Sequence, residues 1–130
     1  TRIAAAAIAL AGAAMMSNAQ AATPAEMLAG YTAQAAAPAV PGRGQQLFTT
    51  SPGRAGSCLS CHGAVPTQAG KHASTGKPID ALAPAFDAQR FTDPAKAEKW
   101  FRRNCNDTIG RECSAGEKAD VLSWLLTLKP

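Results

Sequence analysis

The sequence predicts an all-α fold of about four to five helices with long loops. Three observations support this prediction. Helix-start patterns recur along the chain, the alternation of apolar and polar residues that is typical of strands is missing, and residues 51–84 consist largely of Gly, Pro, Ser and Thr. A long irregular segment inside a small domain usually serves a function, so a bound cofactor would explain it.

The first two helices are expected before this irregular segment. Residues 23–26 (T-P-A-E) have the pattern of a capping box with Pro at the first helical position. The helix that they begin is expected to reach about Ala37, because Pro38 and Pro41 then interrupt it. A second, short helix is expected over about residues 42–49.

Two more helices are expected after the irregular segment. Asp93 and Pro94 begin one that should reach Asn104, and the spacing of Ser114 and Glu117 is that of a capping box at the start of the last helix. The last helix has a broad apolar face suited to packing. That face consists of Val121, Leu122, Trp124, Leu125, Leu126 and Leu128.

The N-terminal segment has the features of a secretory signal peptide. Residues 3–16 are apolar or small, follow Arg2, and precede an A-x-A cleavage pattern at residues 19–21. We therefore expect a cleaved signal peptide over residues 1–21 and a single domain over residues 22–130, exported to the periplasm without a membrane span in its mature form. The alternative is an Ala-rich helix that the mature protein retains.

Charge excludes a nucleic-acid-binding function. The formal net charge is only +4 over 130 residues, and Arg102 and Arg103 are the only adjacent basic residues. A nucleic-acid-binding domain would have a basic tract or a basic surface interleaved with aromatic residues.

Cys58, Cys61 and His62 form a C-x-x-C-H motif, the attachment pattern of c-type haem. Cysteines at this spacing lie on one helical turn and can form thioethers with the two haem vinyl groups. The adjacent His62 can then bind the iron as the proximal ligand.

Two other interpretations of the cysteines fit the sequence less well. A thioredoxin-like C-x-x-C motif would require a βαβ context, which the sequence lacks. A zinc site of four cysteines would require Cys105 and Cys113 at a tighter spacing than theirs. In an exported helical chain, the motif therefore predicts one covalent haem c.

We do not expect the usual methionine as the sixth iron ligand, since no Met follows His62 in the sequence. His72 lies in a loop rich in Gly, Ser, Thr and Lys, which favours a solvated side chain over a ligand. Asn104 is the polar residue on a helix face that also contains Ala97, Trp100 and Phe101. Its position is equally consistent with a distal ligand and with a helix C-terminal cap.

Residues 100–105 (W-F-R-R-N-C) and 110–113 (G-R-E-C) closely resemble the sphaeroides haem protein (SHP) family. So does the segment 70–77, and the resemblance covers most of the chain that follows the expected signal peptide. The related cytochrome c″ has the same architecture but a histidine in place of Asn104.

This resemblance implies a class I cytochrome c fold around the haem and a disulfide between Cys105 and Cys113. It also implies that Asn104 binds ferric iron and leaves on reduction, so that ferrous haem can bind O2, NO or CO in a pocket lined by Trp100 and Phe101. A dihaem cytochrome c is the redox partner that the resemblance implies.

Two other functions are compatible with the residues. One is a plain periplasmic electron-transfer cytochrome c whose distal ligand stays bound. The other is an enzyme that consumes O2 or NO, but the sequence contains no distal acid–base pair like that of a peroxidase. A basic helix face would either dock an acidic redox partner or be solvated. It consists of Lys96, Lys99, Arg102 and Arg103.

Overall fold

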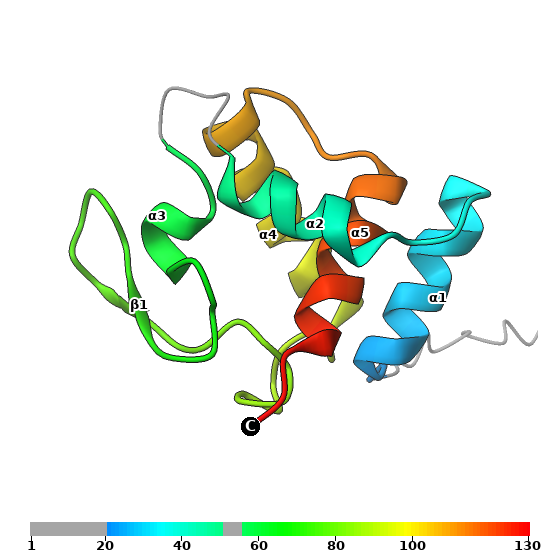
Figure 1. Ribbon diagram of the computed structural model, residues 1–130, viewed down its shortest axis with the longest axis horizontal. Coiled ribbons are helices and arrows are strands. Elements are labelled where there is room, and N and C mark those ends of the chain that lie inside the picture. Colours follow the sequence, from blue (N-terminus) through cyan, green and yellow to red (C-terminus); the bar gives the residue numbers. More distant parts are fainter. Residues whose placement is uncertain (1–20, 51–55) are drawn as a thin grey trace, which may run out of the picture.

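The computed structural model describes residues 21–50 and 56–130 (Figure 1). Of the residues expected to form the signal peptide, all but Ala21 lie outside these ranges. Within the described residues, no helix is long and apolar enough to cross a membrane. The elements in chain order are α1 (Pro24–Ala35), α2 (Pro41–Thr49), α3 (Leu59–His62), β1 (Gly70–Lys71), β2 (Pro78–Ile79), α4 (Pro94–Ile109) and α5 (Ala115–Thr127).

Both predicted capping boxes are present. At α1, the Thr23 hydroxyl accepts a hydrogen bond from the Glu26 N–H while the Glu26 carboxylate accepts one from the Thr23 N–H. Ser114 and Glu117 make the same reciprocal pair at α5. These bonds satisfy backbone donors that a helix start would otherwise leave without a partner.

The core forms around α5, which contacts both α1 and α2 (Figure 1). Its central residues are buried, as its broad apolar face predicts. Met27 and Tyr31 of α1 pack on one part of this face, and Phe48 of α2 packs on another with Trp124. The close crossing of α2 and α5 requires Gly44, because a Cβ there would collide with the carbonyl of Asp120.

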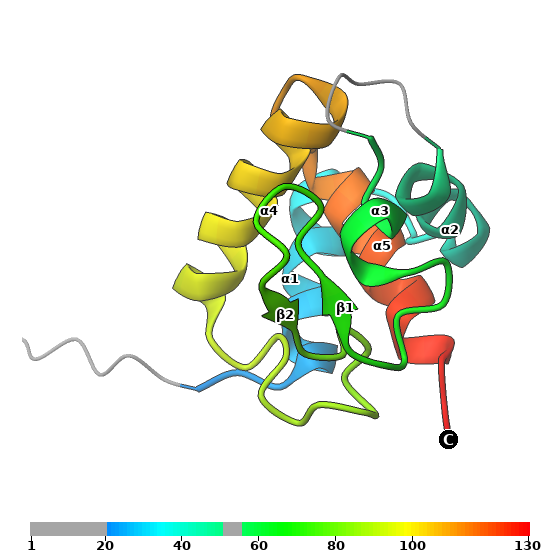
Figure 2. The same cartoon turned by 90° about the vertical axis from the view of Figure 1, so that its left-hand side faces the viewer.

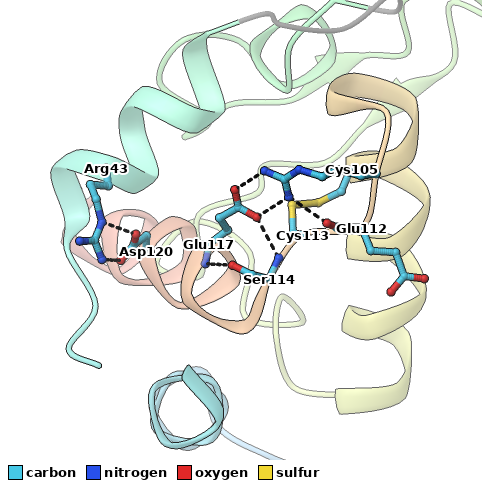
Figure 3. A network of polar contacts seen from close by, with 8 residues as sticks. Arg43, Cys105, Glu112, Cys113, Ser114, Glu117 and Asp120 are labelled. Atoms are coloured by element: carbon cyan, nitrogen blue, oxygen red, sulfur yellow. Dashed lines mark hydrogen bonds and ion pairs between the residues drawn. A yellow bond between two sulfur atoms is a disulfide. The ribbon is translucent and has the colours of Figure 1, made fainter. Parts of the chain in front are cut away.

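Buried Asp120 attaches the start of α2 to α5. Its carboxylate accepts hydrogen bonds from the Val40 N–H at 2.6 Å and from the Arg43 guanidinium at 2.7 and 3.1 Å (Figure 3). Pro41 was expected to interrupt the chain between the first two helices, but it instead occupies the first turn of α2. A missing N–H is not a disadvantage there, so Pro41 starts this helix.

Helix α4 extends beyond Asn104 to Ile109, five residues further than its sequence predicts. It ends where Gly110 adopts a left-handed conformation, with φ of 76°, and donates its N–H to the carbonyl of Asn106. Glycine adopts this conformation without a steric penalty and is the usual residue after a helix end. The correct end signal was therefore Gly110.

The irregular segment contains more regular structure than expected. Helix α3 lies within it, and β1 and β2 form a short antiparallel hairpin, with Gly70 opposite Ile79. The hairpin lies close to α3 at one end of the molecule, with α4 on its other side in Figure 2. The strands are two residues long, which is too short for a period-two pattern to reveal them.

Candidate haem-binding site

The C-x-x-C-H motif forms one helical turn. The carbonyl of Cys58 accepts hydrogen bonds from the N–H groups of Cys61 at 3.3 Å and of His62 at 3.1 Å. Both thiols are free and half-buried. The turn therefore presents two unpaired cysteines and a histidine close together, as attachment of haem requires.

The β1–β2 hairpin supports this turn. The N–H of Ala73 donates a hydrogen bond to the Cys61 Sγ at 3.3 Å. Gly70 lies so close to the motif that an added Cβ would collide with the carbonyl of Cys61. The hairpin thus fixes the backbone and the sulfur of Cys61 together.

His62 lies half-buried beside Phe48, with the two ring centroids 6.1 Å apart. Burial, together with the positive charge of Arg90, lowers the pKa of His62 to about 4. The imidazole is therefore neutral at physiological pH, which is the form that can donate a lone pair to a metal.

Asn104 lies within α4, and its side chain is half-buried. Because the helix continues to Ile109, the interpretation of Asn104 as a C-terminal cap is wrong. Among the described residues, no hydrogen bond engages its amide group; only its backbone carbonyl accepts one, from the Thr108 hydroxyl at 2.7 Å. A side-chain amide of this kind is available to a ligand or a metal.

Thr108 connects this turn of α4 to the cysteine motif. Burial raises the pKa of the Cys58 thiol, and the nearby Thr108 side chain lowers it by a smaller amount. The structure thus brings Cys58 and the turn that follows Asn104 together through one side chain. Sequence reasoning missed Thr108, although its place one turn after Asn104 could have indicated it.

Phe101 and Trp100, the residues expected to line the haem pocket, have different surroundings. Phe101 packs edge-to-face on Tyr31 at 5.8 Å and also contacts Phe91 at 6.1 Å. Trp100 is 41% exposed. The side-chain charges of Lys99 and Arg103 each lie 5.7 Å from the centroid of its ring.

The proximity of these cations to Trp100 corrects the expected division of α4 into an apolar face and an opposite basic face. Trp100 lies at the border between the two faces, so Lys99 and Arg103 reach its ring. Such contacts stabilise the side chains by about 0.5–1 kcal/mol each at exposed sites.

His72 has a local role in the hairpin turn. Its Nδ1 accepts hydrogen bonds from the N–H groups of Ser74 at 3.3 Å and Thr75 at 3.2 Å. The backbone N–H of His72 donates a hydrogen bond to the carbonyl of Lys77 at 2.8 Å. These bonds hold the turn together and support the interpretation that His72 is not an iron ligand.

The four cysteines divide into two pairs. The sulfurs of Cys105 and Cys113 lie 1.99 Å apart, at the distance of a disulfide bond, and both residues are buried (Figure 3). In the part of the chain that the structure describes, no group of three or more His, Cys, Asp or Glu residues could hold a metal ion. The alternative of a four-cysteine zinc site is therefore wrong.

A second contact braces the loop between these two cysteines. The Arg111 guanidinium donates two hydrogen bonds to the Glu117 carboxylate, at 2.7 and 2.8 Å. Glu117 also accepts the N–H of Ser114, and the pKa of Glu117 falls to about 2, chiefly because of Arg111. The loop is thus attached to the start of α5.

The backbone of α4 packs less closely on the other helices than that of α5 does. Helix α5 packs closely on α1 and α2, whereas the backbone of α4 makes only few close approaches to any one of the other described elements. Two free thiols, a neutral imidazole and the half-buried amide of Asn104 on α4 are a donor set suited to haem. The residues present therefore fit covalently attached haem.

The helical fold and this set of residues define a small c-type cytochrome. A family model described as a domain of unknown function, DUF1924, matches residues 34–125. The cytochrome c-type protein SHP of Cereibacter sphaeroides is 52% identical over 107 residues, which cover 79% of this chain and 82% of that protein.

Solved structures agree with this likeness. The structure of oxidised SHP, described as an oxygen-binding cytochrome c, has a TM-score of 0.77 and 50% identity, covering 82% of this chain and 97% of that one. The solution structure of cytochrome c″ from Methylophilus methylotrophus, which addresses haem-ligand detachment, has a TM-score of 0.70 and 35% identity, covering 82% and 94%. The chain belongs to the family of SHP and cytochrome c″, and its cofactor is covalently bound haem c. The resemblance and the fold predicted from the sequence are confirmed.

Proposed function

We propose that this protein is an exported mono-haem cytochrome c whose distal ligand, Asn104, detaches on reduction and opens the ferrous iron to O2, NO or CO. Cys58 and Cys61 form the thioethers, and His62 is the proximal ligand. Bound haem supplies the redox-active iron. The half-buried amide of Asn104, inside a helix that continues past it, is the observation that supports this proposal.

The donor type explains why Asn104 would leave. An amide oxygen is a hard, neutral donor, which suits ferric iron and suits the softer ferrous iron poorly. The Asn104 amide is therefore released by reduction far more readily than a thioether ligand would be. The disulfide that we propose between Cys105 and Cys113 limits how far α4 can move, so the amide stays close enough to bind again on oxidation.

Two relatives support this proposal by what is described for them. SHP is described as an oxygen-binding cytochrome c, and the cytochrome c″ structure addresses detachment of a haem ligand. The proposed role of Asn104 combines these two properties, release of a haem ligand and binding of a gas, in one protein.

We further propose that residues 1–21 are a cleaved signal peptide and that residues 22–130 form a single periplasmic domain. The fold is consistent with this boundary, because the N–H of Ala22 donates to the carbonyl of Thr92 at 2.9 Å and Ala22 packs against the core. The measured mass and N-terminal sequence of the exported protein test it.

The electron donor is proposed to be a dihaem cytochrome c. The surface of α4 presents exposed Lys96, Lys99 and Arg103 around Trp100, and this positive surface would attract an acidic partner. The rate of reduction by the partner should then fall steeply as salt is added.

The test of the proposed function compares the wild type with Asn104→Ala, both as haem-loaded protein. The wild type is expected to be low-spin when ferric, five-coordinate when reduced, and able to bind CO. Asn104→Ala should already be high-spin when ferric. Asn106→Ala is the matched control, because Asn106 lies on the same helix but is exposed and donates only to the carbonyl of Arg102.

Two outcomes would contradict this proposal. An unchanged ferric spectrum in Asn104→Ala would remove Asn104 from the iron. A wild-type protein that stays low-spin after reduction and does not bind CO would instead be an electron-transfer cytochrome with a fixed distal ligand.

A further inference from the structure

Helix α4, which contains Asn104, is connected to the other helices mainly through side chains. The close backbone contacts among the helices join α2 to α5 and α1 to α5. Such an arrangement makes the position of α4 depend on a small number of side-chain contacts. One of these contacts lies immediately after Asn104, at Cys105.

A second contact lies six residues before Asn104, at Glu98. The hydroxyl of Tyr31 in α1 donates to Glu98 Oε1 at 2.7 Å, and the ammonium of Lys118 in α5 donates to Oε2 at 2.7 Å. The same ammonium lies 5.7 Å from the centroid of the Tyr31 ring. Glu98 therefore joins three helices through both of its carboxylate oxygens.

The surroundings of Glu98 favour a well-defined geometry. Tyr31 is only 4% exposed, and the side chain of Lys118 is 15% exposed. Burial acts to raise the pKa of Glu98, but the hydrogen bonds from Lys118 and Tyr31 outweigh burial and lower it. The carboxylate is therefore charged at neutral pH, and hydrogen bonds to a charged acceptor are stronger than those between neutral groups.

The same cluster extends along α4 toward Asn104. The ring of Tyr31 packs edge-to-face on Phe101, which lies one turn after Glu98 on the same helix. Phe101 is in turn three residues before Asn104. Glu98 and Phe101 thus fix the part of α4 that precedes Asn104.

We propose that Glu98 is a positioning residue that, through Tyr31 and Lys118, holds α4 where the Asn104 amide can bind ferric iron. This inference rests on the proposed function. Glu98 fixes α4 on the N-terminal side of Asn104, and the pair Cys105–Cys113 fixes it on the C-terminal side. With both sides held, Asn104 detaches and returns by rotation of its side chain, while the helix backbone stays in place.

The experiment uses the haem-loaded variant Glu98→Gln, which keeps the shape of the side chain but replaces one acceptor oxygen with NH2 and removes the charge. The ferric high-spin fraction should rise, and the ferric affinity for added imidazole should increase roughly twofold to thirtyfold, the range typical of coupling between sites. The ferrous affinity for CO should change by less than about twofold, since the amide has already left in that state.

Glu112→Gln is the matched control, because Glu112 forms only a longer, exposed ion pair with Arg102, at 3.7 Å. It should leave the ferric spectrum and both affinities unchanged. In the double variant Glu98→Gln/Asn104→Ala, the effect of Glu98→Gln on imidazole affinity should disappear, because it acts through Asn104.

A merely structural role would give a different result. If Glu98→Gln lowers the unfolding temperature but leaves the ferric spectrum and the imidazole affinity unchanged, the positioning role of Glu98 is overturned. The proposed function still stands in that case, provided that Asn104→Ala alters the ferric spectrum. If Glu98→Gln does not load haem, Tyr31→Phe tests the same point, because it removes one hydrogen bond and keeps the ring. An unchanged ferric spectrum and imidazole affinity in Tyr31→Phe would then overturn the proposed role of Glu98.

Discussion

The hydroxyl of Thr108 donates a 2.7 Å hydrogen bond to the carbonyl oxygen of Asn104, and the same side chain lies close to the Cys58 thiol. One short side chain thus links the helix turn of the proposed distal ligand to the first cysteine of the haem motif. A threonine that bonds back to the preceding turn is common in helices and usually has little effect on stability. Its proximity to Cys58 distinguishes Thr108.

Replacing this hydroxyl is predicted to affect the haem site. Thr108→Val keeps the branched shape but leaves the part-buried Asn104 carbonyl without this donor, so the unfolding free energy should fall by about 1 kcal/mol. The ferric spectrum should shift at the same time. Thr49→Val is the matched control. Thr49 makes the same bond to the preceding turn, at 2.9 Å to the Gln45 carbonyl, but this bond is exposed at the end of α2, so the variant should be nearly neutral.

Removal of the Cys105–Cys113 bond is predicted to destabilise the protein without unfolding it. In the chain-entropy model, a disulfide across so short a loop stabilises by about 2–3 kcal/mol. Chemical denaturation of the ferric double variant Cys105→Ala/Cys113→Ala measures this loss. The variant should still fold, because Arg111 and Glu117 continue to hold the loop. Alkylation of Cys105 in the unreduced, denatured wild type would show that no disulfide had formed.

The Arg111–Glu117 pair makes stability depend on pH in the acid range. The pKa of Glu117 is about 2 in the folded protein, below its ordinary value of 4.5. Its charged form stabilises the fold, so the contribution is complete above about pH 4.5 and is lost as the pH falls toward 2. Because Arg111 is 58% exposed, solvent screening reduces this contribution to about 1 kcal/mol.

The variant Glu117→Gln measures this contribution. The difference in unfolding free energy between wild type and variant should be largest near pH 6 and should approach zero near pH 2. If the difference in unfolding free energy stays constant between pH 6 and pH 2, the charge of the Glu117 carboxylate does not contribute to stability.

The crossing of α2 and α5 is predicted to tolerate no side chain at Gly44. Gly44→Ala should lower the unfolding free energy by about 2 kcal/mol or more, because the added methyl meets the backbone of Asp120. Gly30→Ala in α1 is the control, since its added Cβ has no neighbour within 4 Å and alanine favours a helix. That variant should be stabilised by about 0.5–1 kcal/mol in thermal or chemical unfolding. Equal effects of the two substitutions would contradict the proposed close packing.

Features encoded by neighbouring residues were predictable from the sequence. The capping boxes at Thr23 and Ser114 and the haem motif at Cys58 involve residues no more than four positions apart, so their spacing identifies them directly. The family resemblance confirmed by the relatives depends on similarly short blocks of sequence.

Other features depend on the tertiary structure. The two-residue strands of the hairpin form because their segment lies against α3, and their own residues show no strand pattern. The bond between Tyr31 and Glu98 joins residues 67 positions apart, and no local spacing could predict it.

The sequence by itself determined which residues are suited to hold haem and which asparagine is the candidate distal ligand. Only the tertiary structure decided between a cap and an available amide at Asn104, because the choice depended on where α4 ends. It also decided what holds that helix in place. Spacing along the chain specifies interactions within one or two helical turns, whereas the position of α4 depends on contacts among three helices that meet only after folding.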